Sequence, residues 1–266
     1  MRIINAHGGD ALQICLGPTD KQLIISIKPE DAKLVRKARR KSNFYVVVHG
    51  KYIYNFCRPL STPGWSWQYD LLIKELEQAA TIGADVIIHQ GKNVLGLQHT
   101  VARQNFVDGI VHVLSRHNGT NKLLLENSAH QGTEIGYSLE DLTAIWQLIP
   151  AQYQSRIGFC LDLCHIFVAG ELDMRDGAAV QRYLDEFTSI LPLELVHFND
   201  SNVAFQSHND EHAGIGAGYI GSPSKGGSMD GFKVIADFCK TYKVPMILET
   251  PVGAAIQAEI TLVRDI

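Results

Sequence analysis

Histidines and carboxylates recur along this chain at the points where short apolar runs end. The run 157–161 leads into Asp162, and five further runs end in the same way. Imidazole nitrogens and carboxylate oxygens are the usual protein ligands of divalent metal ions. A single histidine of this kind would most often be an ordinary core or loop residue, but six successive endings are hard to attribute to chance. The six are His49, His89, Glu126, Asp162, His197 and Glu249.

Three further candidate ligands lie outside these runs. His165 follows Asp162 by three residues, and the pair Asp210 and His212 stands in a long segment after His197. An Asp-x-His pair in an extended loop places two ligands where they can hold one ion. The four glycines 214, 216, 218 and 221 that follow would let the backbone approach a ligand closely. The nearby His130 and His208 are interpreted as non-ligands.

Nine ligands are too many for one zinc ion, which is usually four-coordinate. They suit three ions, with one carboxylate bridging two of them. Clusters of this kind act on phosphate esters, because a bound ion makes water a nucleophile near neutral pH and another stabilises the departing oxygen. The net charge of −4 does not exclude a polyanionic substrate, since three divalent ions would change it to +2. The residues alone therefore predict a multi-metal phosphoesterase.

The elements that must position these residues alternate regularly. Apolar, β-branched runs predict strands, and the segments between them predict helices, so the chain reads as successive parallel βαβ units. In a TIM barrel the carboxyl ends of all strands meet at one face, which would gather the nine residues. An open doubly wound sheet is the alternative, although no G-x-G-x-x-G follows the first strand. The expected strands are 44–48, 85–88, 122–125, 157–161, 193–196 and 244–248, and the expected helices are 29–40, 66–82, 98–117, 138–148, 176–190, 229–242 and 254–264.

The start of the chain departs from this alternation. Residues 2–6 and 11–16 both read as strands, yet the four residues between them are too few for a helical crossover. Either the first barrel helix is missing or residues 2–6 pair antiparallel with the next strand. The expected fold is therefore an α/β, TIM (β/α)8-type barrel with an abbreviated N-terminal βα unit, forming one domain over residues 1–266.

Composition limits the cellular compartments in which the protein is expected. No secretory signal peptide is recognised near the start, and no apolar stretch approaches the roughly 18 residues that a membrane span needs. Five scattered cysteines favour a reducing compartment, cytoplasmic or nuclear, over a disulfide scaffold. Cys160 and Cys164 are expected to be buried thiols, and the basic residues between 33 and 41 a solvated helix face.

Several motifs together resemble the endonuclease IV family of apurinic/apyrimidinic endonucleases. They are Leu-Glu-Asn-Ser-Ala-His-Gln-Gly (125–132), Leu-Asp-Leu-Cys-His (161–165), His-Phe-Asn-Asp-Ser (197–201), Asp-Glu-His-Ala-Gly-Ile-Gly-Ala-Gly-Tyr-Ile-Gly (210–221) and Ile-Leu-Glu-Thr (247–250). The resemblance implies a monomeric barrel that cuts double-stranded DNA 5′ to an abasic site. The products would be a 3′-hydroxyl and a 5′-deoxyribose phosphate, and 3′-end phosphodiesterase activity is expected beside this incision.

The resemblance also implies roles for individual residues. Three Zn²⁺ ions are expected, with Mn²⁺ as an alternative at one site. Glu126 and Glu249 would be catalytic together with a zinc-bound hydroxide, Tyr52 would line the abasic-site pocket, and Lys21 and Gln22 would contact DNA. No aromatic wedge occurs in the loop that holds Lys21. The first ion would take His49, His89 and Glu126; the second Glu126, Asp162, His197 and Glu249; the third His165, Asp210 and His212.

Two other readings remain open. A single-metal sugar isomerase or epimerase of the xylose isomerase-like superfamily would need only Glu126, Asp162, His197 and Glu249. A protein that binds damaged DNA without cutting it would have no reason to keep all nine ligands. Counting the bound ions separates the nuclease from the isomerase, because three zinc ions indicate the first and one manganese or magnesium ion the second.

Overall fold

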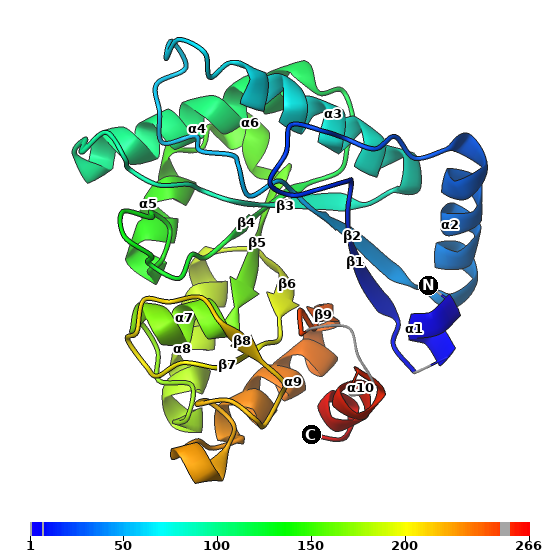
Figure 1. The fold of residues 1–266 in the computed structure, drawn as a ribbon, viewed down its shortest axis with the longest axis vertical. Coiled ribbons are helices and arrows are strands. Elements are labelled where there is room, and N and C mark those ends of the chain that lie inside the picture. Colours follow the sequence, from blue (N-terminus) through cyan, green and yellow to red (C-terminus); the bar gives the residue numbers. More distant parts are fainter. Residues whose placement is uncertain (1, 7, 251–255) are drawn as a thin grey trace.

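The computed structural model describes residues 2–6, 8–250 and 256–266, and its centre is a sheet of seven parallel strands. The β-branched runs at the predicted positions form these strands, which confirms the α/β barrel. Helices surround the strands in Figure 1. In sheet order the strands are β1 (Ala11–Cys15), β2 (Tyr45–His49), β3 (Asp85–His89), β4 (Leu123–Glu126), β5 (Ile157–Asp162), β6 (Leu193–His197) and β9 (Met246–Ile247).

The longer helices also lie where they were predicted. Ser138 begins α5 by accepting a hydrogen bond from the backbone N–H of Asp141, as its capping pattern indicates. The sequence pattern did not reveal the short helix that follows Asp162, the one-turn helix before β5, or a two-stranded hairpin near Asp200. The described helices are α1 (Arg2–Ala6), α2 (Pro29–Ser42), α3 (Trp67–Ile82), α4 (His99–Arg116), α5 (Leu139–Leu148), α6 (Ala151–Gln154), α7 (Leu163–Ala169), α8 (Gly177–Ile190), η1 (Pro223–Lys225), α9 (Asp230–Tyr242) and α10 (Ile256–Asp265), and the hairpin strands are β7 (Asp200–Ser201) and β8 (His212–Ala213). None of these helices is long and apolar enough to span a bilayer.

The prediction of a strand at residues 2–6 is wrong. Arg2–Ala6 form α1, whose carbonyls at Ile4 and Asn5 accept hydrogen bonds from the N–H groups of Gly9 and Gly8. Gly8 has a left-handed backbone (φ 84°), which glycine adopts without strain at a helix end. The sheet therefore has seven described strands, and neither expected arrangement of a first strand occurs. Of the last predicted helix, residues 254 and 255 lie outside the described residues.

Two apolar layers hold the barrel together. The larger one packs helices against the outside of the strands, and the smaller one fills the inside. The inner layer takes one buried side chain from each of six strands, in the manner of a TIM-barrel interior. Its members are Val47, Ile87, Leu124, Cys160, Leu195 and Ile247, with Ala11 and Tyr45 packed against them.

One buried carboxyl group outside the barrel interior makes stability depend on pH. Glu75 of α3 accepts a hydrogen bond from the Tyr54 hydroxyl at 2.9 Å, and its other oxygen has no partner among the described residues. Burial raises its pKa from 4.5 to about 7. The ionised form is thus disfavoured in the folded state, so the fold loses stability as pH rises from about 4.5 to 7.

Replacing Glu75 with glutamine should remove this pH dependence. Relative to the native chain, the variant should gain roughly 3 kcal/mol of unfolding free energy between pH 4.5 and pH 8, because one pKa unit corresponds to about 1.4 kcal/mol. Denaturant unfolding at both pH values measures the change. Glu77→Gln, an exposed position of the same helix, controls for the loss of one charge. Parallel stability curves for Glu75→Gln and the native chain would contradict the prediction.

Candidate metal centre

The six predicted strand-end residues lie together because each follows a member of the inner apolar layer by two positions. Side chains two apart on a strand point to the same face of the sheet. Val47 therefore predicts the direction of His49, Leu124 that of Glu126, and Ile247 that of Glu249. The structure brings all six to the carboxyl-terminal mouth of the barrel, directly above the apolar interior.

Glu126 is the centre of this group. Its Oε1 lies 2.8 Å from Nδ1 of His197 and 3.5 Å from Nδ1 of His165. Its Oε2 lies 3.4 Å from Nε2 of both His49 and His89. Burial acts to raise the pKa of Glu126, but the adjacent His197 and His89 hold it well below the usual glutamate range. The low pKa favours the carboxylate form of this buried group, which is the form that can bind a divalent ion.

The second set of ligands gathers around Asp210. Its two oxygens lie 3.1 Å from Nε2 of His165 and 3.0 Å from Nε2 of His212. His212 belongs to β8, which pairs with β7 and so returns the loop to the barrel mouth. Burial acts to raise the pKa of Asp210, yet the adjacent imidazoles of His165 and His212 hold it far below its usual value.

Four overlapping groups of side chains have ligand atoms within 4.8 Å of one another. Among the described residues, Oε2 of Glu126 and Nε2 of both His165 and His212 are buried and make no well-aligned hydrogen bond, although each lies close to another candidate ligand. Buried polar atoms normally find a partner, so these three fit coordination to a metal ion. The groups are His49, His89 and Glu126; Glu126, Asp162, His197 and Glu249; Asp162, His165 and His212; and Cys164, Asp210 and His212.

Two asparagines outside the predicted ligand set support these ligands. Asn127 donates to the carbonyl of Asp162 at 3.1 Å, and its own backbone carbonyl is 2.8 Å from Nδ1 of His165. Asn199 donates to Asp162 at 2.7 Å and to Glu249 at 3.1 Å. Both asparagines come within two residues of a strand-end ligand, and this spacing is a signal that the sequence contained.

The glycine-rich loop serves a purpose that differs from the expected one. Its backbone closes around the buried carboxylate of Asp200, which accepts hydrogen bonds from four N–H groups of the segment 216–221. A Cβ atom on Gly218 would lie 2.3 Å from that carboxylate, so only glycine fits. The glycines therefore allow a close approach to Asp200 and thereby shape the loop that carries Asp210 and His212.

The remaining predicted residues lie at the rim. The Tyr52 ring is 4.9 Å from the His49 ring, and 61% of the side chain is exposed. Lys21 and Gln22 are exposed in the loop after β1, which a hydrogen bond from the N–H of Tyr52 to the Thr19 carbonyl joins to the Tyr52 segment. Among the described residues, no hydrogen bond or ion pair joins the side chain of Lys21 or Gln22 to a candidate metal ligand. Cys160 and Cys164 are buried as expected, although Cys164 also adjoins Asp210 and His212.

The two histidines interpreted as non-ligands, His130 and His208, pack against other aromatic rings. His130 stacks on Tyr137 with ring centroids 3.7 Å apart, and His208 meets His130 edge-on at 4.9 Å. Neither appears among the groups of potential ligands in the described part of the chain. Their role as non-ligands stays a prediction.

Comparison with known proteins identifies the family. The family model of xylose isomerase-like TIM barrels matches residues 1–225. A putative endonuclease 4 of Acanthamoeba polyphaga mimivirus is 34% identical over 257 residues, covering 93% of this chain and 79% of that protein. The chain belongs to the endonuclease IV family. A probable endonuclease 4 of Chloroflexus aurantiacus is 32% identical over 252 residues, covering 92% of this chain and 84% of that protein.

The fold agrees with this assignment. Endonuclease IV from Thermus thermophilus superposes with a TM-score of 0.80 at 24% identity, covering 99% of this chain and 91% of that one. The endonuclease IV family is metal dependent, and this chain has clustered candidate ligands where such a site is expected. The resemblance seen in the sequence motifs is thus confirmed.

Proposed function

We propose that this protein is a zinc-dependent apurinic/apyrimidinic endonuclease of DNA repair. It hydrolyses the phosphodiester on the 5′ side of an abasic site in double-stranded DNA, leaving a 3′-hydroxyl and a 5′-deoxyribose phosphate, and trims blocked 3′ ends by the same hydrolysis. The observation that carries the proposal is the overlap of the ligand groups, which share Glu126 and Asp162. Membership of the endonuclease IV family supports it.

The nine side chains would divide among three Zn²⁺ ions, with Mn²⁺ as an alternative at one site. Bound there, the ions would make water acidic enough to supply a nucleophile at neutral pH and would neutralise charge on the phosphate. His49, His89 and Glu126 would hold the first ion, and Glu126, Asp162, His197 and Glu249 the second. His165, Asp210 and His212 would hold the third.

The protein's own groups orient the reaction. Carboxylate oxygens of Glu126 and Glu249 lie 2.8 Å and 3.2 Å from Nδ1 of His197, so the three side chains would converge on one ion. The negative charges of the two carboxylates would balance part of the charge of the bound ions and so moderate the attraction of the site for the phosphate. The exposed Tyr52 ring lies at the mouth, where it can cover the sugar that lacks a base, and Lys21 and Gln22 lie on the adjoining rim to contact the DNA backbone.

The chain is proposed to act as a single-domain monomer over residues 1–266. All five cysteines are free, and four of them are buried. Free thiols at these positions accord with a reducing compartment, the cytoplasm or the nucleus.

The sugar isomerase reading accounts for fewer of the observed contacts. Such an enzyme would use Glu126, Asp162, His197 and Glu249, which form one of the groups. It would leave no role for the contacts that His165 and His212 make with Asp210, or for the two histidines facing Oε2 of Glu126. The single-metal function is therefore the weaker candidate.

Two measurements on purified protein test the proposal together. Elemental analysis should find three zinc ions per chain, and the same preparation should cut a duplex with one abasic residue while sparing the matched intact duplex. One bound manganese or magnesium ion, together with turnover of a ketose or aldose, would establish the isomerase instead. Tight binding to the abasic duplex without cutting would establish a damage-recognition protein.

Replacing Tyr52 with alanine should weaken use of the abasic substrate without disturbing the metal centre. Because the site lacks a base, the loss is that of burying the ring against the sugar, about 1.5–3 kcal/mol, so kcat/KM should fall between roughly tenfold and 150-fold while the zinc content stays unchanged. Tyr242→Ala is the matched control, because that tyrosine is 68% exposed on α9. Equal kcat/KM values for the two variants would remove Tyr52 from the substrate site.

A further inference from the structure

We infer that Gln13 is a positioning residue. It would orient the ligands of one proposed ion by bridging the opening between β1 and β9. The inference deepens the proposed function and rests on it. Gln13 does not belong to any motif of the family resemblance and is not itself a metal ligand. Its role follows from where its side chain lies and from what its amide group can donate and accept.

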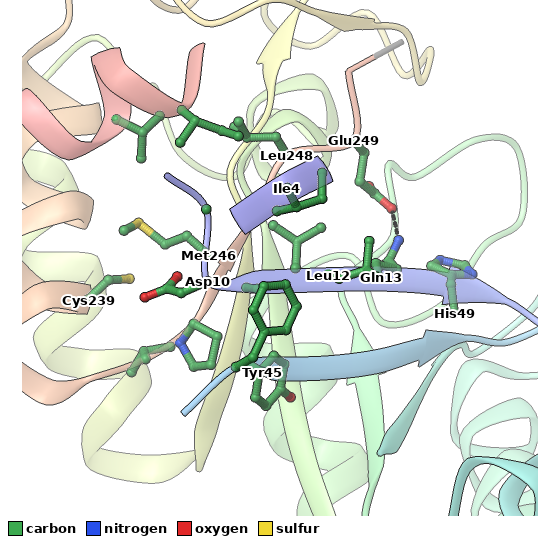
Figure 2. A pocket seen from close by; sticks show the side chains of 18 of the residues that line it. Ile4, Asp10, Leu12, Gln13, Tyr45, His49, Cys239, Met246, Leu248 and Glu249 are labelled. Atoms are coloured by element: carbon green, nitrogen blue, oxygen red, sulfur yellow. Dashed lines mark hydrogen bonds between the residues drawn. The ribbon is translucent and has the colours of Figure 1, made fainter. Parts of the chain in front are cut away.

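The barrel is open on one side. Within the described residues, β1 and β9 are the two ends of the sheet order and no strand lies between them. The opening contains a cavity of about 1600 Å³ whose lining includes Leu12, Gln13, Met246 and Glu249. Figure 2 shows the Gln13 side chain reaching from β1 to Glu249 across this opening. A side-chain contact thus spans a position where a complete barrel would have a backbone ladder.

Gln13 contacts two proposed ligands of the second ion. Its Nε2 donates to Oε1 of Glu249 at 2.5 Å, and its Oε1 lies 2.8 Å from Nε2 of His197. A carboxylate can only accept hydrogen bonds, so Glu249 determines which end of the amide faces it. The amide oxygen must then face His197.

This orientation selects the tautomer of His197. Because an amide oxygen only accepts, Nε2 of His197 must carry a hydrogen atom. In the neutral imidazole Nδ1 then keeps its lone pair, and Nδ1 is the atom that faces Glu126, Asp162 and Glu249 at 2.8, 3.6 and 3.2 Å. In metal-binding histidines, a hydrogen bond made by the ring nitrogen that does not bind the metal fixes the orientation and basicity of the ring.

The position of Gln13 on β1 explains why it can do this. Ala11 packs against the inner apolar layer, and Gln13, two residues later, points the same way. Glu249 needs the support, because β9 pairs over only two residues. Asn199 donates a hydrogen bond to the other oxygen of Glu249 at 3.1 Å. Each oxygen of the carboxylate thus accepts a hydrogen bond from a side-chain amide. A merely structural bridge across the opening is the alternative role.

The test compares Gln13→Leu and Gln13→Glu with the native chain. Leucine removes both hydrogen bonds, whereas glutamate keeps an acceptor for His197 but places a second carboxylate against Glu249. Gln181→Leu is the matched control, because it removes an amide-to-carboxylate bond of 2.9 Å on α8. Stepwise zinc release to a chromophoric chelator is measured for each zinc-loaded protein, together with kcat and KM at limiting and saturating zinc.

Both Gln13 variants should release one of the three zinc ions about ten to a hundred times more readily, the usual cost of losing an outer partner, while the other two and the control stay unchanged. The kcat of Gln13→Leu should fall at limiting zinc and recover at saturating zinc, with KM unchanged. Native-like release, equal weakening of all three ions, or a kcat loss that zinc does not restore would each overturn the inference. If the native chain binds a single ion, the three-ion function fails, but the effect of Gln13 on that ion still decides its role.

Discussion

Replacing Glu249 with glutamine should abolish incision at an abasic site while the protein remains folded. The Glu249 carboxylate lies 3.2 Å from Nδ1 of His197 and belongs to the ligand group that also holds Glu126 and Asp162. Removing a residue that hydrogen-bonds a metal ligand lowers metal affinity or activity about ten- to a hundredfold. Removing the negative charge of a ligand itself should therefore lower kcat by more than about a hundredfold. Gel assays on a duplex with one abasic analogue measure the rate, and circular dichroism checks the fold.

A nearby acid supplies the control for Glu249. Glu211 lies between the candidate ligands Asp210 and His212 in the sequence. It is exposed, and its carboxylate accepts hydrogen bonds from the side chains of Asn202 and Asn209. Glu211→Gln should therefore cut at close to the native rate. Cleavage by Glu249→Gln at the native rate would show that this carboxylate does not serve the reaction.

Removing the bound metal should eliminate cleavage and lower the melting temperature. Glu126 and Asp162 are buried with exposures of 1% and 0%, and their charges have only histidines and amides as partners once the ions leave. An ion present at a thousand times its dissociation constant stabilises the native state by about 4 kcal/mol. Differential scanning fluorimetry before and after exhaustive chelation measures the shift.

Metal replacement completes the test of chelation. Zinc added to the chelated protein should restore both the melting temperature and the cleavage, whereas magnesium should restore neither, because imidazole-rich sites favour zinc and carbonyl or carboxylate sites favour magnesium. Cleavage that survives exhaustive chelation would be incompatible with the proposed mechanism. Restoration by magnesium alone would indicate a site built on the carboxylates without the histidines.

The strand-end ligands could be predicted because the information is local. Alternation of side chains along a strand is a property of a few consecutive residues, so the run ending at His49 or Glu126 already determines which way that ligand points. The regular spacing of six such runs then indicates a parallel barrel, whose geometry gathers the ends. The pair Asp210 and His212 has no such periodicity, and its Asp-x-His spacing in a glycine-rich segment was the local signal that predicted it.

Other features depended on contacts that the sequence pattern does not contain. The strand pattern of residues 2–6 competes with the two glycines that close α1, and β9 is paired only at Met246 and Ile247 although the apolar run is longer. The glycines near 218 suggested an approach to a ligand, but they surround Asp200, which precedes them by more than 15 residues. These features depend on contacts between residues that are distant in the sequence, and the local secondary-structure propensity of a segment does not predict such contacts.

By itself, then, the sequence determined the barrel class, the family and the inward direction of the six strand-end side chains, because each of these follows from spacing along one short segment or from a motif. Only the tertiary structure decided that the barrel is open between β1 and β9, that Asp200 holds the loop of the third ligand set, and that Gln13 reaches Glu249. Those contacts join residues as far as 236 positions apart. The curvature of the sheet brings these residues together, and no short sequence pattern predicts such a contact.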